Sequence, residues 1–196
     1  PPVLQTYDPS CYLCPGNERA GGIHNPAYSG AYAFDNDFAS LLMTPDPKQV
    51  SHNGLLLAEP EQGTCRVICF SPRHDLTLPE LPLQDAIGVI DTWAKESADL
   101  GALPQVNYVQ VFENKGAMMG CSNPHPHSQV WATHHIPNEP AKELSTQAEY
   151  YATHQRPLLA YYLAQELAAG ERVLFTNDDF TALVPFWAVW PFEVLV

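Results

Sequence analysis

Two histidines and a glutamine alternate along one short stretch of the chain. His125, His127 and Gln129 stand two residues apart in the segment N-P-H-P-H-S-Q. Positions at this spacing share one face of a β-strand, so we expect the three side chains to point the same way. Two imidazoles beside an amide suggest phosphoryl-group chemistry with histidine as nucleophile, because neutral imidazole is nucleophilic near pH 7. The pair could also be half of a metal site or simple surface decoration.

A glycine-bearing loop, Gly116 to Ser122, comes directly before this stretch. Its small residues and its hydroxyl allow the backbone to approach a phosphate group closely. Pro124 and Pro126 lack N–H groups and suit an edge or irregular backbone better than a central strand. The loop and the glutamine together favour catalysis over surface decoration.

The hydrophobic pattern predicts the elements that must position these residues. Strands are predicted over 31–38, 55–58, 64–71, 106–112, 127–134, 172–176 and 181–186, and helices over 83–100, 139–155 and 157–169. We expect a turn at 60–63 to join the second and third strands. We also expect 106–112 to pair with 127–134, and Asn138 to cap the second helix. This mixture predicts an α+β fold, mostly antiparallel sheet with flanking helices.

The composition limits the possible functions. The 196 residues, 45% of them apolar, can form a domain with a real core, and no apolar run is long enough to span a bilayer. A net charge of −13 argues against nonspecific nucleic-acid binding, which needs a basic face. Five cysteines that include a C-x-x-C pair predict a reducing compartment, the cytoplasm, and a metal rather than a disulfide framework.

Cys11 and Cys14 form the C-x-x-C pair, whose spacing lets two thiolates hold one Zn²⁺. A structural zinc site needs two further ligands, and His74 and His125 are the candidates. A C-x-x-C pair without any metal is the alternative interpretation.

The segment 112–132, F-E-N-K-G-A-M-M-G-C-S-N-P-H-P-H-S-Q-V-W-A, closely resembles the active-site segment of the galactose-1-phosphate uridylyltransferase family, within the histidine-triad superfamily. The resemblance extends to C-Y-L-C-P-G-N at 11–17, F-D-N-D-F at 34–38, R-V-I-C-F-S-P at 66–72 and P-F-W-A-V-W-P-F-E at 185–193. Ser128 departs from the bacterial relatives, which often carry glycine there, and we expect it to face away from the site.

The resemblance implies a fold of two similar halves. It predicts an N-terminal catalytic histidine-triad-like domain over 1–185 and the start of a second, otherwise missing half over 186–196. It also implies a homodimer that binds UDP-glucose and galactose 1-phosphate. The implied reaction moves UMP through a uridylyl-histidine intermediate by a ping-pong route, giving glucose 1-phosphate and UDP-galactose.

The resemblance further assigns roles to individual residues. His127 is the nucleophile, Gln129 donates an amide hydrogen bond to the phosphoryl group, and Ser122 holds the hexose phosphate. The other expected substrate contacts are Ala20, Asn36, Asp37, Asn114, Gly120 and Cys121. Zinc is expected at Cys11, Cys14, His74 and His125. Glu143 matches a glutamate that binds a second metal in the family, often iron.

Gln129 also bears on the type of reaction. Histidine-triad hydrolases carry a third histidine at this position, whereas a neutral amide cannot protonate a leaving group. The glutamine therefore favours a transferase over a hydrolase. Two alternatives remain open. Dinucleoside-tetraphosphate phosphorylases carry the same glutamine, and a zinc-stabilised nucleotide-binding module would need no turnover.

Overall fold

The chain forms two compact units, which we describe separately. The computed structural model describes residues 5–44 and 50–196, and the units divide after Ile136. This division lies well before the domain boundary predicted at residue 185. Helices and antiparallel strands occur together, which confirms the α+β class.

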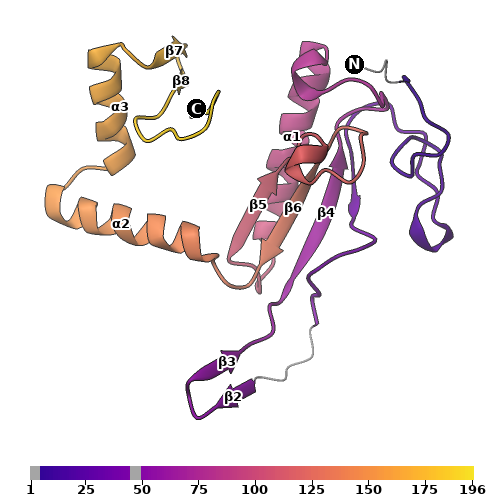
Figure 1. Cartoon of the computed structure of the whole chain (residues 1–196), viewed down its shortest axis with the longest axis horizontal. Coiled ribbons are helices and arrows are strands. Elements are labelled where there is room, and N and C mark those ends of the chain that lie inside the picture. Colours follow the sequence, from indigo (N-terminus) through magenta and orange to yellow (C-terminus); the bar gives the residue numbers. More distant parts are fainter. Residues whose placement is uncertain (1–4, 45–49) are drawn as a thin grey trace. The chain divides into compact units, whose positions relative to one another are not determined.

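A four-stranded antiparallel sheet forms the centre of the first unit (Figure 1). In spatial order its strands are β1 (Tyr32–Asp35), β4 (Gly63–Cys69), β6 (His127–Thr133) and β5 (Tyr108–Phe112). The predicted pairing of 106–112 with 127–134 is confirmed. The site strand β6 is central rather than at an edge. It can be central because Pro124 and Pro126 precede its first residue, so no ladder position inside it lacks an N–H.

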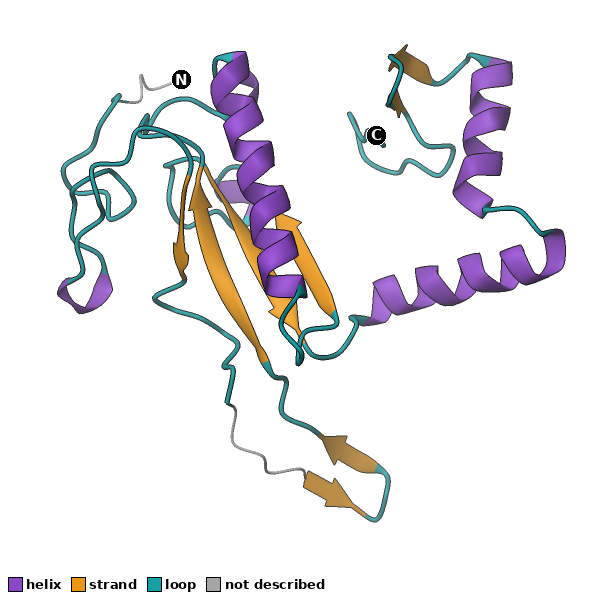
Figure 2. Cartoon of the chain, turned by 180° about the vertical axis from the view of Figure 1, so that it is seen from behind, coloured by secondary structure: helices purple, strands orange, loops and turns teal. Residues whose placement is uncertain are grey.

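Helix α1 (Leu83–Gly101) lies across one face of this sheet (Figure 2). The side chains of Ile68, Val130 and Ala132 are fully buried on that face and pack with Leu100 of the helix. Fully burying a side chain of the size of Ile68 or Val130 contributes roughly 1.5–3 kcal/mol. The helix predicted over 83–100 is therefore confirmed. Its buried residues are Val89, Glu96 and Leu100, whereas Leu83, Ile87 and Ile90 of the apolar pattern are exposed.

The opposite face of the sheet is covered by the N-terminal segment. Cys11, Leu13 and Cys14 are buried there against Val67 and Cys69 of β4. The C-x-x-C turn is thereby packed onto the sheet close to the start of β6, because Cys69 pairs with His127 in the β4–β6 register.

A separate hairpin replaces one predicted pairing. β3 (Leu56–Ala58) pairs with β2 (Val50–His52) and not with β4. The two strands are joined at Asn53 and Gly54, whose φ angles are 54° and 70°. An Asn-Gly pair with two positive φ values is typical of a tight hairpin turn, and the N–H of Leu55 donates to the carbonyl oxygen of His52 across it at 3.0 Å. The expectation that 60–63 turns the chain from 55–58 back into 64–71 was therefore wrong.

The second unit contains two helices and a short hairpin. Its elements are α2 (Asn138–His154), α3 (Leu158–Ala169), β7 (Val173–Thr176) and β8 (Thr181–Leu183). Asn138 is the first helical residue and makes no capping bond, so the capping prediction was wrong. Gly170 ends α3 with a φ of 67°, as glycine commonly does after a helix. No helix within the described residues is long and apolar enough to cross a membrane.

Candidate active site and metal centre

His127 is the first residue of β6, and one hydrogen bond fixes the orientation of its ring. Its Nδ1 lies 2.8 Å from the carbonyl oxygen of His125. A carbonyl oxygen only accepts, so Nδ1 must carry the proton and donate it. The other nitrogen, Nε2, then keeps its lone pair in the neutral ring, which makes it the nucleophilic atom of this side chain.

A first pocket of about 150 Å³ lies beside this ring. Gln129 lines it together with His127, as expected for positions two apart on a strand. Ser122 comes from the glycine-bearing loop, and Asn36 and Asp37 come from the segment directly after β1. Tertiary structure thus brings five of the predicted site residues to one pocket.

Asp37 has a partner that the sequence did not indicate. Arg19 Nη1 donates to Asp37 Oδ1 at 2.9 Å, and the guanidinium carbon lies 3.9 Å from the centre of the Phe34 ring. Both charged side chains are largely buried, which makes the pair stronger than an exposed one. The salt bridge holds Asp37 at the pocket wall.

A second pocket of about 450 Å³ meets the first at Ser122 and His127. Its walls include Asn114 and Cys121, both expected to contact substrate, and the cationic Lys115. Glu113 also lines it, and partial burial raises the pKa of its carboxyl group. His127 therefore lines both cavities.

Two expected substrate contacts lie outside these pockets. Ala20 is exposed in the short 3-10 turn Ala20–Gly22, and Gly120 is exposed at the end of the turn Ala117–Met119. Neither residue lines the first or the second pocket. Their substrate contacts stay a prediction.

His125 does not join His127 and Gln129 at the first pocket. His125 precedes β6, is fully buried and does not line the first pocket. Its Nδ1 lies 3.5 Å from Cys14 Sγ. The side chain of His125 therefore contacts the C-x-x-C segment instead of the pocket.

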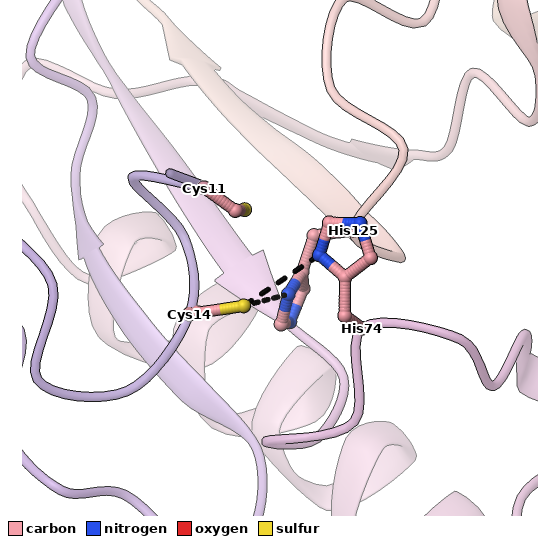
Figure 3. A group of neighbouring side chains, drawn as sticks. All are labelled: Cys11, Cys14, His74 and His125. Carbon is pink, nitrogen blue, oxygen red and sulfur yellow. Dashed lines mark hydrogen bonds between the residues drawn. The ribbon is translucent and has the colours of Figure 1, made fainter. Parts of the chain in front are cut away.

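Four side chains from three segments of the chain converge on one buried point (Figure 3). The ligand atoms of Cys11, Cys14, His74 and His125 all lie within 4.8 Å of one another. Among the described residues, this is the group of potential metal ligands whose side chains lie close enough together to hold an ion. The two cysteines of the C-x-x-C pair and the two histidines predicted as their partner ligands thus form one cluster.

The spacing of this cluster fits a tetrahedral metal. Cys14 Sγ lies 3.5 Å from Nδ1 of His74 and 3.5 Å from Nδ1 of His125. Zinc bonds of about 2.3 Å to sulfur and about 2.0 Å to nitrogen at a tetrahedral angle separate the two ligand atoms by about 3.5 Å. Two thiols and two imidazoles are also the donor set of many structural zinc sites. The residues present therefore fit a metal.

Hydrogen bonding prepares His125 for this role. Its Nε2 donates to the carbonyl oxygen of Ser71 at 3.0 Å, which leaves Nδ1 with a lone pair facing the cluster. Burial lowers the pKa of His125 to about 4, so the ring is neutral at pH 7. Burial raises the pKa of Cys14 to about 11 in the protein without metal, so a bound cation must displace its proton.

Asn123 is a supporting residue that sequence reasoning missed. Its Oδ1 accepts the backbone N–H of His125 at 2.9 Å and lies 3.5 Å from Cys11 Sγ. The side chain is buried, so it ties the metal cluster to the segment that leads into β6. The sequence signal for this contact is the asparagine two residues before His125, because Asn side chains often hydrogen-bond the backbone two residues further on.

Ser128 faces away from the pocket, as predicted. It is fully buried on the helix side of β6, where its Oγ accepts the indole N–H of Trp93 at 2.8 Å. Trp93 packs against the apolar core and also makes this polar contact to the site strand, which local spacing does not indicate.

Glu143 lies on α2 in the second unit. It lines a pocket there with Leu158 and Trp187. Among the described residues it belongs to no group of three or more metal-ligand side chains. Its role as a ligand stays a prediction.

The first unit is an antiparallel sheet with a helix on one face, and a central strand of this sheet presents a histidine and a glutamine to a pocket. These features define a protein of the histidine-triad class. Comparison with known families narrows this class. The model for the N-terminal domain of galactose-1-phosphate uridyl transferase matches residues 1–137, and the model for the C-terminal domain matches 143–196. The chain belongs to the galactose-1-phosphate uridylyltransferase family.

Individual relatives agree with this assignment. The galactose-1-phosphate uridylyltransferase of Haemophilus influenzae is 48% identical over 97% of this chain and 54% of its own length. The rat protein of the same name is 48% identical over 100% of this chain and 52% of its own. A solved uridylyltransferase superposes with a TM-score of 0.82 at 26% identity, covering 98% of this chain and 60% of its own. The chain thus spans about half the length of the curated relatives it matches.

Proposed function

We propose that this protein transfers UMP from UDP-glucose to galactose 1-phosphate, with His127 as the nucleophile. One observation carries the proposal. The Nδ1 proton of His127 is committed to the carbonyl oxygen of His125 at 2.8 Å, which leaves Nε2 available in a pocket that also contains Gln129. The names of the relatives support the choice of substrates.

The reaction takes place in two displacements. The Nε2 lone pair forms a bond to the α-phosphorus of UDP-glucose, and the bond from this phosphorus to the bridging oxygen breaks, releasing glucose 1-phosphate with the electron pair. A phosphate oxygen of galactose 1-phosphate then attacks the same phosphorus, the N–P bond breaks, and the neutral imidazole returns. UDP-galactose is the product.

Residues of this chain can stabilise the charges that develop in these steps. The uridylylated ring is cationic, and the carbonyl of His125 accepts its Nδ1 proton throughout. The Gln129 amide can donate to the phosphoryl oxygen that gains charge, and Ser122 stands where the two pockets meet. Asn36 and Asp37 suit ribose hydroxyls in the first pocket, whereas Asn114 suits the phosphates in the second.

We propose zinc as the metal at Cys11, Cys14, His74 and His125. Zinc would act structurally by fixing His125, whose carbonyl orients the catalytic ring. For Glu143 we propose a second metal site, with iron as the candidate, completed by ligands from elsewhere. The five cysteines are free, which suits the cytoplasm, and the family resemblance supports a homodimer.

A trapping experiment tests the proposal. The protein is mixed with UDP-glucose without any acceptor, and intact mass spectrometry looks for one added uridylyl group. We expect the adduct in the wild type and its loss in His127→Ala. His134→Ala is the matched control, because His134 follows the same strand but lines neither pocket. An adduct of wild-type yield in His127→Ala would refute the assignment.

The choice of acceptor then separates the related activities. Galactose 1-phosphate should discharge the adduct rapidly to UDP-galactose. A preference for orthophosphate would instead indicate a phosphorylase, and a wild type that never forms the adduct would indicate a binding module.

A further inference from the structure

Trp131 contacts Gln129 on the pocket face of β6. The two residues stand two apart on the strand, and Trp131 Nε1 donates to Gln129 Oε1 at 3.2 Å. The indole is held in turn by Phe112 of β5, whose ring centre lies 6.0 Å away at an interplanar angle of 73°. Phe112 is also the residue paired with Gln129 across the β5–β6 ladder.

This contact decides which end of the Gln129 side-chain amide faces Trp131. An indole N–H can only donate, whereas the amide has an accepting oxygen at one end and a donating NH₂ group at the other. The reversed amide would set two donors against each other. The oxygen must therefore face Trp131, and the NH₂ group is left for the pocket that Gln129 shares with His127.

We propose that Trp131 is a positioning residue that locks the Gln129 amide with its NH₂ group toward the transferred phosphoryl group. The inference deepens the proposed function and rests on it. An anionic phosphoryl oxygen gains from the NH₂ group and is repelled by the amide oxygen. Fixing the amide in advance means that no reorientation is needed when the phosphorus gains charge.

Trp131→Phe removes the indole N–H and keeps an aromatic ring against Phe112. The loss of one net hydrogen bond of this kind corresponds to roughly a three- to tenfold change in rate. Single-turnover uridylylation by UDP-glucose should slow by this factor at saturation, with little change in the concentration at half-saturation. The final adduct level gives the active fraction of each variant, so misfolded protein does not distort the rate.

Two comparisons separate positioning from a general effect on the fold. In a Gln129→Leu background, Trp131→Phe should cause no further slowing, because no amide remains to be oriented. Trp93→Phe removes the indole N–H that contacts the opposite face of the same strand at Ser128, and the rate should stay at the wild-type value. Equal slowing in both Gln129 backgrounds, or a wild-type rate in Trp131→Phe, would overturn the inference.

Nuclear magnetic resonance tests the contact without any turnover. Solvent exchange of the Trp131 indole proton should accelerate in Gln129→Leu and stay slow in Gln129→Glu, which keeps an accepting oxygen. The Trp93 indole proton should be unaffected in both. Unchanged exchange at Trp131 in Gln129→Leu would refute the hydrogen bond. Absence of any uridylyl adduct in the wild type refutes the proposed function instead, and the exchange measurement still decides the contact.

Discussion

Acid should destabilise the metal-free protein through His125. The unfolded histidine has a pKa near 6.5, whereas burial lowers the folded value to about 4. A group with a depressed folded pKa stabilises the fold fully above its unfolded pKa, and this contribution is lost as the pH falls through the folded pKa. The affected window is therefore pH 6.5 down to about 4.

The size of the effect follows from the same two pKa values. At 1.36 kcal/mol per pKa unit, the drop from 6.5 to about 4 corresponds to about 3 kcal/mol of folding free energy. The side chain is fully buried, so solvent screening does not reduce this contribution much. Losing about 3 kcal/mol is large against a typical total of roughly 5–15 kcal/mol.

The assay is urea unfolding of chelator-treated protein at several pH values between 7 and 4. Hydrogen exchange of peptides from β4 and β6 follows the first unit alone, so the second unit does not affect the signal. The wild type should lose about 3 kcal/mol more across this range than His125→Asn, which cannot titrate. His134→Asn, the same substitution at an exposed histidine, should follow the wild type. Parallel pH curves for the wild type and His125→Asn would refute the reasoning.

Three further changes have defined outcomes. Gly63→Ala should lower the free energy of unfolding by roughly 1–3 kcal/mol in urea, because the added Cβ would lie 2.2 Å from the carbonyl oxygen of Ala132, and an unaltered midpoint would contradict this. Elemental analysis of the wild type should find roughly one zinc per chain. Cys11→Ser combined with Cys14→Ser should abolish this zinc and lower the melting temperature, whereas a metal-free wild type of full stability would exclude a structural zinc. Gln129→His should raise the ratio of UMP released to UDP-galactose formed, because an imidazole can take up a proton where an amide cannot. An unchanged ratio would mean that Gln129 does not set transfer over hydrolysis.

The sequence by itself determined the elements whose pattern is local. The helical pattern of α1 and the alternation of His127 and Gln129 repeat within a few residues, so the sequence indicates them directly. The family motifs then supplied roles for these residues. The Asn53-Gly54 turn is an equally local signal in the sequence, but it was overlooked. The apolar run after it pairs with β2 and not with the strand expected after 60–63.

Tertiary structure alone decided which distant groups meet. His125 is buried in the cluster with Cys14 and His74 and does not line the first pocket, which no pattern within the H-x-H stretch could indicate. The Arg19–Asp37 salt bridge crosses from one loop to another, and a contact of this kind leaves no mark on local periodicity. Local spacing fixes the face on which a side chain lies, but long-range packing fixes the partner that it finds there.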